Sequence, residues 1–130
     1  MNRSVTIVGL GEVLWDVFPS GPRFGGAPAN FACSAAELGR DRVQVHVVSG
    51  VGQDELGKRA IETQQQHNVD VTEPQRNAKP TGQVLISLDQ QGVASYKFAE
   101  DTAWDNLLWT DALKDLAANT DVVCFGTLGQ

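Results

Sequence analysis

The chain has 130 residues, the size of one ordinary domain or of a large part of one. Its 16 acidic and 10 basic residues give a formal net charge of -6, which disfavours nucleic acid and membrane as main partners. No apolar run approaches the roughly 18 residues that span a bilayer, and no signal-peptide pattern begins the chain, so we expect a cytoplasmic protein. Cys33 and Cys124 lie far apart in apolar surroundings, which predicts two reduced, buried thiols and no zinc site.

The first part of the chain predicts two strands and a helix. The β-branched run 5–8 predicts a buried strand that ends at Gly9. Residues 12–18 form a second strand-like stretch, closed by the prolines and glycine of 19–22, which we expect to be a loop. The Ala-rich segment 29–38 predicts a helix, with Pro28 near its first turn and Gly39 just past its last.

The rest of the chain continues with strands and capped helices. Asp54 and Thr110 are each placed to cap the helix that follows them. Residues 89–92 carry a hairpin signal between two strand-like runs. The elements predicted in this part are strand 43–48, a helix from Asp54 to about His67, strands 83–88 and 93–98, a helix over 111–118 and strand 121–125.

Alternation of strands and helices predicts an open α/β sheet of largely parallel strands. Three stretches, 12–18, 83–88 and 93–98, are not followed by crossover helices, so we place them in a small separate sheet. The sequence stops about five residues past the predicted end of the last strand, where ligands bind in open α/β sheets. We therefore expect it to be the first part of a longer protein.

Two glycine-rich stretches imitate nucleotide-binding motifs. After Gly9-Leu-Gly11 the third glycine position of a dinucleotide fingerprint holds Leu14, and strand-like residues follow where a helix N-terminus is needed. This argues against a nicotinamide-dependent oxidoreductase. In 21–26 the glycine spacing is that of a P-loop, but Ala27-Pro28 occupy the positions of the phosphate-binding lysine and the Mg²⁺-binding hydroxyl.

A different set of residues predicts a polyol or sugar site. Asp16 lies among apolar neighbours, where a carboxylate costs free energy unless it is paired. Gly25 and Gly26 let a backbone approach a ligand closely, and Asn30 falls in the first turn of the following helix. A carboxylate and an amide supply the acceptors and donors that vicinal hydroxyls need. The alternatives are an exposed edge carboxylate at Asp16 and a cap or surface role for Asn30.

Other polar residues predict structural roles. Asp54 opens a helix after a glycine loop and is first of all an N-cap. His46 and His67 have no partner at ligand spacing.

Four ordered motifs resemble the N-terminal half of the ribokinase-like (PfkB) carbohydrate kinases, and two of them are most similar to the fructokinase branch. The resemblance extends from Val5 to Leu128. The motifs are Gly11-Glu-Val-Leu-Trp-Asp16-Val-Phe-Pro19, Gly25-Gly26-Ala-Pro-Ala-Asn30-Phe-Ala32 with Gly39, Val51-Gly-Gln-Asp54-Glu-Leu-Gly57 and Val123-Cys-Phe-Gly-Thr-Leu128.

The resemblance implies a doubly wound, mostly parallel sheet and a small β-sheet lid formed by about 12–24 and 81–100. It also implies that the lid takes part in a possible homodimer. By resemblance, the sugar-binding residues are Asp16, Gly26 and Asn30, with Gly25 assisting the tight approach, a ring from Phe98 or Tyr96, and a contact from Thr127.

The family's second signature, a Gly-Ala-Gly-Asp element that supplies the general base and charge stabilisation, does not occur in these 130 residues. The resemblance therefore implies the N-terminal, substrate-binding part of a kinase over 1–130, without the C-terminal ATP-binding half. No catalytic, cofactor-binding or metal-binding residue is assigned here; ATP and Mg²⁺ are expected for the complete enzyme. We expect phosphorylation of a primary hydroxyl of fructose or a similar hexose. The alternative is a non-catalytic carbohydrate-binding or regulatory module.

Overall fold

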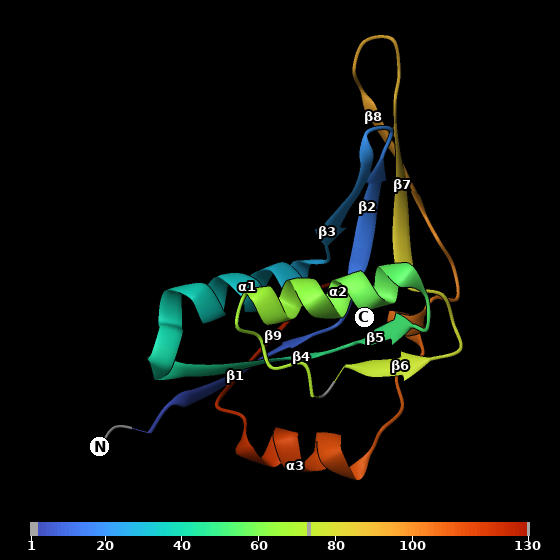
Figure 1. The fold of residues 1–130 in the computed structure, drawn as a ribbon. Helices are drawn as coiled ribbons and strands as arrows, with labels where there is room; N and C mark the ends of the chain where they lie inside the picture. The colour runs from blue at the N-terminus through green and yellow to red at the C-terminus, as the bar shows by residue number, and fades with distance from the viewer. Residues whose placement is uncertain (1–2, 73, 130) are drawn as a thin grey trace.

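The computed structural model describes residues 3–72 and 74–129 of the chain and shows an α/β fold (Figure 1). Short 3₁₀ turns at Arg40–Arg42 and Ala103–Asp105 lie between the main elements. In chain order these elements are β1 (Val5–Leu10), β2 (Leu14–Phe18), β3 (Gly21–Gly25), α1 (Ala27–Gly39), β4 (Val43–Val48), β5 (Gly50–Gly52), α2 (Glu55–Gln66), β6 (Gln75–Asn77), β7 (Gly82–Leu88), β8 (Ala94–Phe98), α3 (Asp111–Asn119) and β9 (Val122–Phe125).

The main sheet is parallel and has the strand order β4-β1-β9. Helices α1 and α2 lie on one side of it and α3 lies on the other (Figure 1). Successive side chains of a strand point to opposite faces of the sheet, so alternate residues pack against the two helical layers. Val47 packs in one core cluster with Ala32 of α1, whereas Val8 and Val48 pack with Leu113 of α3. The expected doubly wound, mostly parallel arrangement is therefore confirmed.

A second sheet stands off the first and has the order β3-β2-β7-β8 (Figure 1). Strands β2 and β7 pair in parallel, and the two outer pairs are antiparallel. The turn between β7 and β8 is closed by the N–H of Gly92, which donates to the carbonyl of Asp89 at 3.0 Å. The small separate sheet expected from the sequence is present, and it contains one strand more than the three stretches that predicted it.

That additional strand corrects the expectation for residues 19–22. Only Pro19 and Ser20 form the turn, and β3 begins at Gly21 and pairs with β2. Pro22 is tolerated because β3 is an edge strand, where one N–H is not needed by a neighbour. The three-residue strands β5 and β6, which pair in parallel, were not predicted either, since each is too short to show a period.

The two thiols differ in burial, so the prediction that both are buried is wrong for Cys124. Both cysteines are free. Cys33 is buried in the core under α1, and burial raises the pKa of its thiol, helped by the nearby carboxylate of Glu37. Cys124 is only half-buried, because β9 is the outer strand of the main sheet.

Trp15 of β2 joins the base of the small sheet to α2. Its indole N–H donates to the carbonyl of Leu56 at 3.0 Å. The guanidinium of Arg59 lies 4.7 Å from the ring centroid, and Phe24 meets the ring edge-on at 5.7 Å. The buried side chain of Trp15 therefore attaches the base of the small sheet to α2.

Among the described residues, no helix is both long and apolar enough to cross a membrane.

Candidate functional site

The register of the small sheet places the predicted sugar residues of its strands on one face. Asp16 is paired with Arg23 on one side and with Val84 on the other, and Val84 is paired with Phe98. Paired residues in neighbouring strands point to the same face of a sheet. Asp16 and Phe98 therefore share a face, with the buried Val84 between them. Tyr96 lies on this face too, two residues before Phe98 in β8.

The Asp16 carboxylate lies directly against Gly25. A Cβ placed on Gly25 would be 3.3 Å from Cγ of Asp16 and 2.7 Å from its Oδ2, and the second distance is closer than real Cβ contacts come. Asp16 is half-buried, and within residues 3–72 and 74–129 it forms no ion pair. Arg23, its neighbour across β3, instead stacks its guanidinium 4.9 Å from the centroid of Phe18. The carboxylate therefore keeps acceptor capacity for a ligand.

Gly26 and Asn30 form the start of α1. Gly26 is the N-cap with φ of 101°, a value that favours glycine, and a Cβ there would lie 2.3 Å from the carbonyl oxygen of Glu12. The side chain of Gly26 is a hydrogen, so no side-chain cap covers the first N–H groups of the helix. The backbone N–H of Asn30 donates to the carbonyl of Gly26 at 2.9 Å, and Asn30 is exposed. The Asp16 carboxylate thus lies against Gly25, and Gly26 and Asn30 follow at the start of α1.

Thr127 lies in a different place, in the exposed turn after β9. Beside it is a cavity of about 310 Å³ at the carboxyl ends of β1 and β9. Neither Asp16 nor Asn30 lines this cavity. Its wall includes Leu10, Gly11, Trp104, Phe125 and Gly126.

The residue that connects these two regions is Glu12, which the sequence analysis did not single out. Its Cγ lies 3.4 Å from a Cβ position on Gly26, and its carboxylate faces Gly126. The sequence feature that could have indicated Glu12 is its position directly after the Gly9-Leu-Gly11 turn, which ends a buried strand.

Asp54 has the structural role predicted for it. Its carboxylate caps α2 by accepting from the N–H of Gly57 at 2.8 Å, and it also accepts from the Thr81 hydroxyl at 2.6 Å and the Thr81 N–H at 2.9 Å. Partial burial acts to raise the pKa of Asp54, but these hydrogen bonds outweigh it, so the pKa lies below its usual value.

The two histidines each approach one carboxylate. His46 Nδ1 is 3.8 Å from Asp70, and His67 Nδ1 is 2.5 Å from Glu37. No three His, Cys, Asp or Glu side chains gather as a metal site in the part of the chain that the structure describes. The described residues therefore offer no cluster of side chains that would hold a Mg²⁺ ion.

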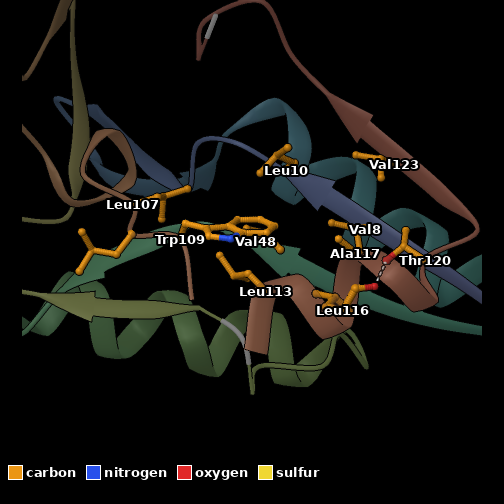
Figure 2. Close-up of a pocket in the computed structure, with 11 residues that line it drawn as sticks. Val8, Leu10, Val48, Leu107, Trp109, Leu113, Leu116, Ala117, Thr120 and Val123 are labelled. Carbon is orange, nitrogen blue, oxygen red and sulfur yellow. Dashed lines mark hydrogen bonds between the residues drawn. The ribbon is translucent and has the colours of Figure 1, made fainter. Parts of the chain in front are cut away.

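A groove of about 400 Å³ lies between the main sheet and α3 (Figure 2). Its wall is almost wholly apolar and includes Val8, Trp109, Leu113 and Val123. In Figure 2 the hydroxyl of Thr120 is directed at the carbonyl of Leu116, to which it donates at 2.7 Å. A sugar needs several donors and acceptors, so this groove is unsuited to the predicted substrate.

Comparison with known proteins identifies the family. Residues 20–130 match the model of the pfkB family carbohydrate kinases. The chain belongs to this family. It is 32% identical over 124 residues to a fructokinase of Klebsiella pneumoniae, covering 91% of this chain and 39% of that protein. Across the curated relatives that we compared, the chain spans 31–39% of their length.

Solved structures agree with this assignment. An uncharacterized sugar kinase of Pyrococcus horikoshii superposes with a TM-score of 0.82 at 29% identity, covering 95% of this chain and 43% of that one. The same protein in complex with ATP gives a TM-score of 0.80, covering 92% and 42%. The α/β fold of this chain is therefore that of the N-terminal part of a pfkB sugar kinase.

Proposed function

We propose that this chain forms the sugar-binding part of a fructokinase-type kinase, which transfers the γ-phosphoryl group of ATP to a primary hydroxyl of the sugar. The observation that carries the proposal is the contact between the Asp16 carboxylate and Gly25, directly before the N-terminus of α1. The fructokinase relatives support the choice of a ketohexose such as fructose as substrate.

Each site residue has a chemical task in this proposal. The free acceptors of Asp16 bind two vicinal hydroxyls of the sugar. Gly25 and Gly26 let the sugar lie against bare backbone, and the Asn30 amide both donates and accepts at the helix start. The ring of Phe98, which is 49% exposed on the Asp16 face, covers the apolar side of the sugar. Thr127 contacts the sugar from the turn after β9.

Phosphoryl transfer requires groups beyond the sugar-binding residues proposed here. The family's general base and its ATP-binding region belong to a C-terminal part, which we propose completes the enzyme together with ATP and Mg²⁺. Phosphoryl transfer depends on positioning and electrostatic stabilisation of the transferring group. We therefore propose that the 130-residue chain binds sugar but shows no turnover. ATP-dependent formation of fructose phosphate by the purified chain contradicts this.

We also propose that the small sheet is a lid that contributes to a homodimer. Large apolar side chains of β7, the hairpin and β8 are 49–64% exposed: Leu85, Leu88, Val93, Tyr96 and Phe98. Several of them share the Asp16 face, so one surface serves both the sugar and a second lid. Light scattering after gel filtration is expected to give the mass of two chains.

Asp16→Asn tests the site directly. The amide keeps the size of the side chain but removes the charge that strengthens the hydrogen bonds, so we expect about 10- to 100-fold weaker fructose binding by isothermal titration calorimetry. Asp115→Asn, an exposed change on α3, is the matched control and leaves the affinity unaltered. Equal fructose affinity in Asp16→Asn and the unsubstituted chain overturns the proposed site.

A further inference from the structure

Glu12 lies where the Gly26 turn meets the turn that carries Thr127. It lies two residues after the end of β1 and is only 4% exposed. One end of the residue packs against Gly26, where a Cβ would lie 2.3 Å from the Glu12 carbonyl oxygen and 3.4 Å from its Cγ. The other end faces Gly126, where a Cβ would lie 3.6 Å from Oε1 and 3.9 Å from Oε2. The side chain therefore bridges two regions of the proposed sugar site.

The carboxylate of Glu12 lacks a donor among residues 3–72 and 74–129. Oε2 is fully buried and accepts no hydrogen bond from these residues. A buried carboxylate oxygen without a donor costs free energy, because it has lost its water and gained nothing in return. Such a group in a folded protein calls for a donor from outside the described residues, and a ligand is one that can supply it.

A cavity lies next to two neighbours of Glu12, although Glu12 itself does not line it. Gly11, the residue before it in the chain, and Gly126, the residue against it in space, both line the cavity of about 310 Å³ at the carboxyl ends of β1 and β9. Ligands bind at this end of open α/β sheets. Gly126 has no side chain, so only its backbone lies between the carboxylate and this cavity at that point. A carboxylate only accepts hydrogen bonds, so the matching group on a ligand is a hydroxyl.

We propose that Glu12 is a second sugar-binding carboxylate, which accepts a hydrogen bond from a hydroxyl at the Thr127 end of the sugar. This inference rests on the proposed sugar-kinase function. Asp16 binds the end of the sugar that lies under the small sheet, and Glu12 binds the opposite end. Two carboxylates on two segments then select a sugar whose hydroxyls match both.

The test combines side-chain changes with hydroxyl deletions in the sugar. Fructose and its monodeoxy analogues are titrated into the unsubstituted chain and into Glu12→Gln by calorimetry. We expect Glu12→Gln to weaken fructose binding about 10- to 100-fold. One deoxy analogue loses affinity in the unsubstituted chain but loses much less in Glu12→Gln, because its missing hydroxyl and the missing charge belong to one hydrogen bond. Glu62→Gln, an exposed change on α2, is the control and binds all sugars as before.

The outcomes separate this inference from the function on which it rests. If the unsubstituted chain binds no fructose, the proposed function fails and the Glu12 assignment fails with it. If that chain binds fructose but every deoxy analogue loses the same factor with and without Glu12→Gln, the Glu12 assignment alone is wrong. Gly126→Ala serves if Glu12→Gln does not fold. Its methyl group lies 3.6 Å from Oε1 and covers the carboxylate, so it must weaken fructose binding; unchanged affinity overturns the proposal.

Discussion

A methyl group at residue 25 would collide with the carboxylate on which the proposed site depends. In Gly25→Ala the new Cβ comes within 2.7 Å of Oδ2 of Asp16, so the Asp16 side chain must turn away. Residue 25 ends an ordinary strand, and its backbone accepts alanine. We expect fructose affinity to fall about tenfold or more, while the free energy of unfolding in urea changes by less than about 1 kcal/mol.

Ser95→Ala is the control for this change in the small sheet. Ser95 is exposed on the face of β8 opposite to Asp16, as its pairing with Ser87 shows. We expect it to alter neither fructose affinity nor stability. If Gly25→Ala binds fructose as tightly as the Ser95→Ala variant, the position of the Asp16 carboxylate is irrelevant to binding.

The predicted site residues that the structure places near one another are also close along the chain. Gly26 and Asn30 are one helical turn apart, and Asp16 and Gly25 lie on paired strands of a short hairpin, where the Asp16 carboxylate is next to Gly25. Local geometry therefore determines their proximity. Glu12 escaped notice because its buried state depends on packing against Gly126, more than a hundred residues away, and no periodicity along the chain reports such a contact.

At the scale of elements, Trp15 is the contact that ties the small sheet to α2. Trp15→Phe removes the indole N–H from the Leu56 carbonyl and leaves that carbonyl without this donor. We expect the free energy of unfolding to fall by about 1–3 kcal/mol. The Trp15 side chain points away from the Asp16 face, because the two residues are adjacent in β2. Fructose affinity is therefore retained.

Trp109→Phe is the matched control, since Trp109 is 73% exposed. Its effect on the free energy of unfolding is expected to stay within about 0.5 kcal/mol. Equal effects of the two changes, measured by urea denaturation, contradict the role given to Trp15.

Long elements followed from the sequence, whereas short ones did not. Three helices were predicted from the small apolar residues of α1 and from the cap residues Asp54 and Thr110. The side chains of both cap residues accept a backbone N–H from the helix that follows, as expected. Strand β3 was read as a loop because it contains Gly21 and Pro22. Its pairing with β2 overrides that local preference, which is the usual way in which tertiary contacts override propensity.

For the whole molecule, carboxylates that connect distant segments predict a loss of stability in acid. Hydrogen bonds from the Lys79 side chain and from the Thr6 N–H hold the pKa of Asp101 and Asp121, respectively, below the usual value. The pKa of Asp54 is lowered as well, against the effect of its partial burial. A carboxyl whose pKa is lower in the folded state contributes stability above its unfolded pKa, about 3.9, and loses it as pH falls through the folded pKa.

We therefore expect the free energy of unfolding to decrease below about pH 4. Asp54→Ala lowers it by about 1–2 kcal/mol at pH 7, because it removes the cap of α2. This difference from the unsubstituted chain shrinks as the pH falls through the folded-state pKa of Asp54, below which the carboxyl is protonated in both states. Urea titrations from pH 2 to 7 measure it, with Asp115→Ala as the exposed control. A difference that is constant with pH contradicts the assigned charge state.

The parallel pairing of β2 with β7 has a consequence for the order of folding. Leu14 and Gly82 are register partners, so the central pair of the small sheet closes a loop that contains α1, β4 and α2. Closing so long a loop is entropically unfavourable until the enclosed segments are themselves compact. We therefore expect the β1-α1-β4 unit to fold first and the four-stranded sheet to assemble late. A chain emerging from the ribosome would expose the unpaired edge of β2 until the β7 segment has been synthesised.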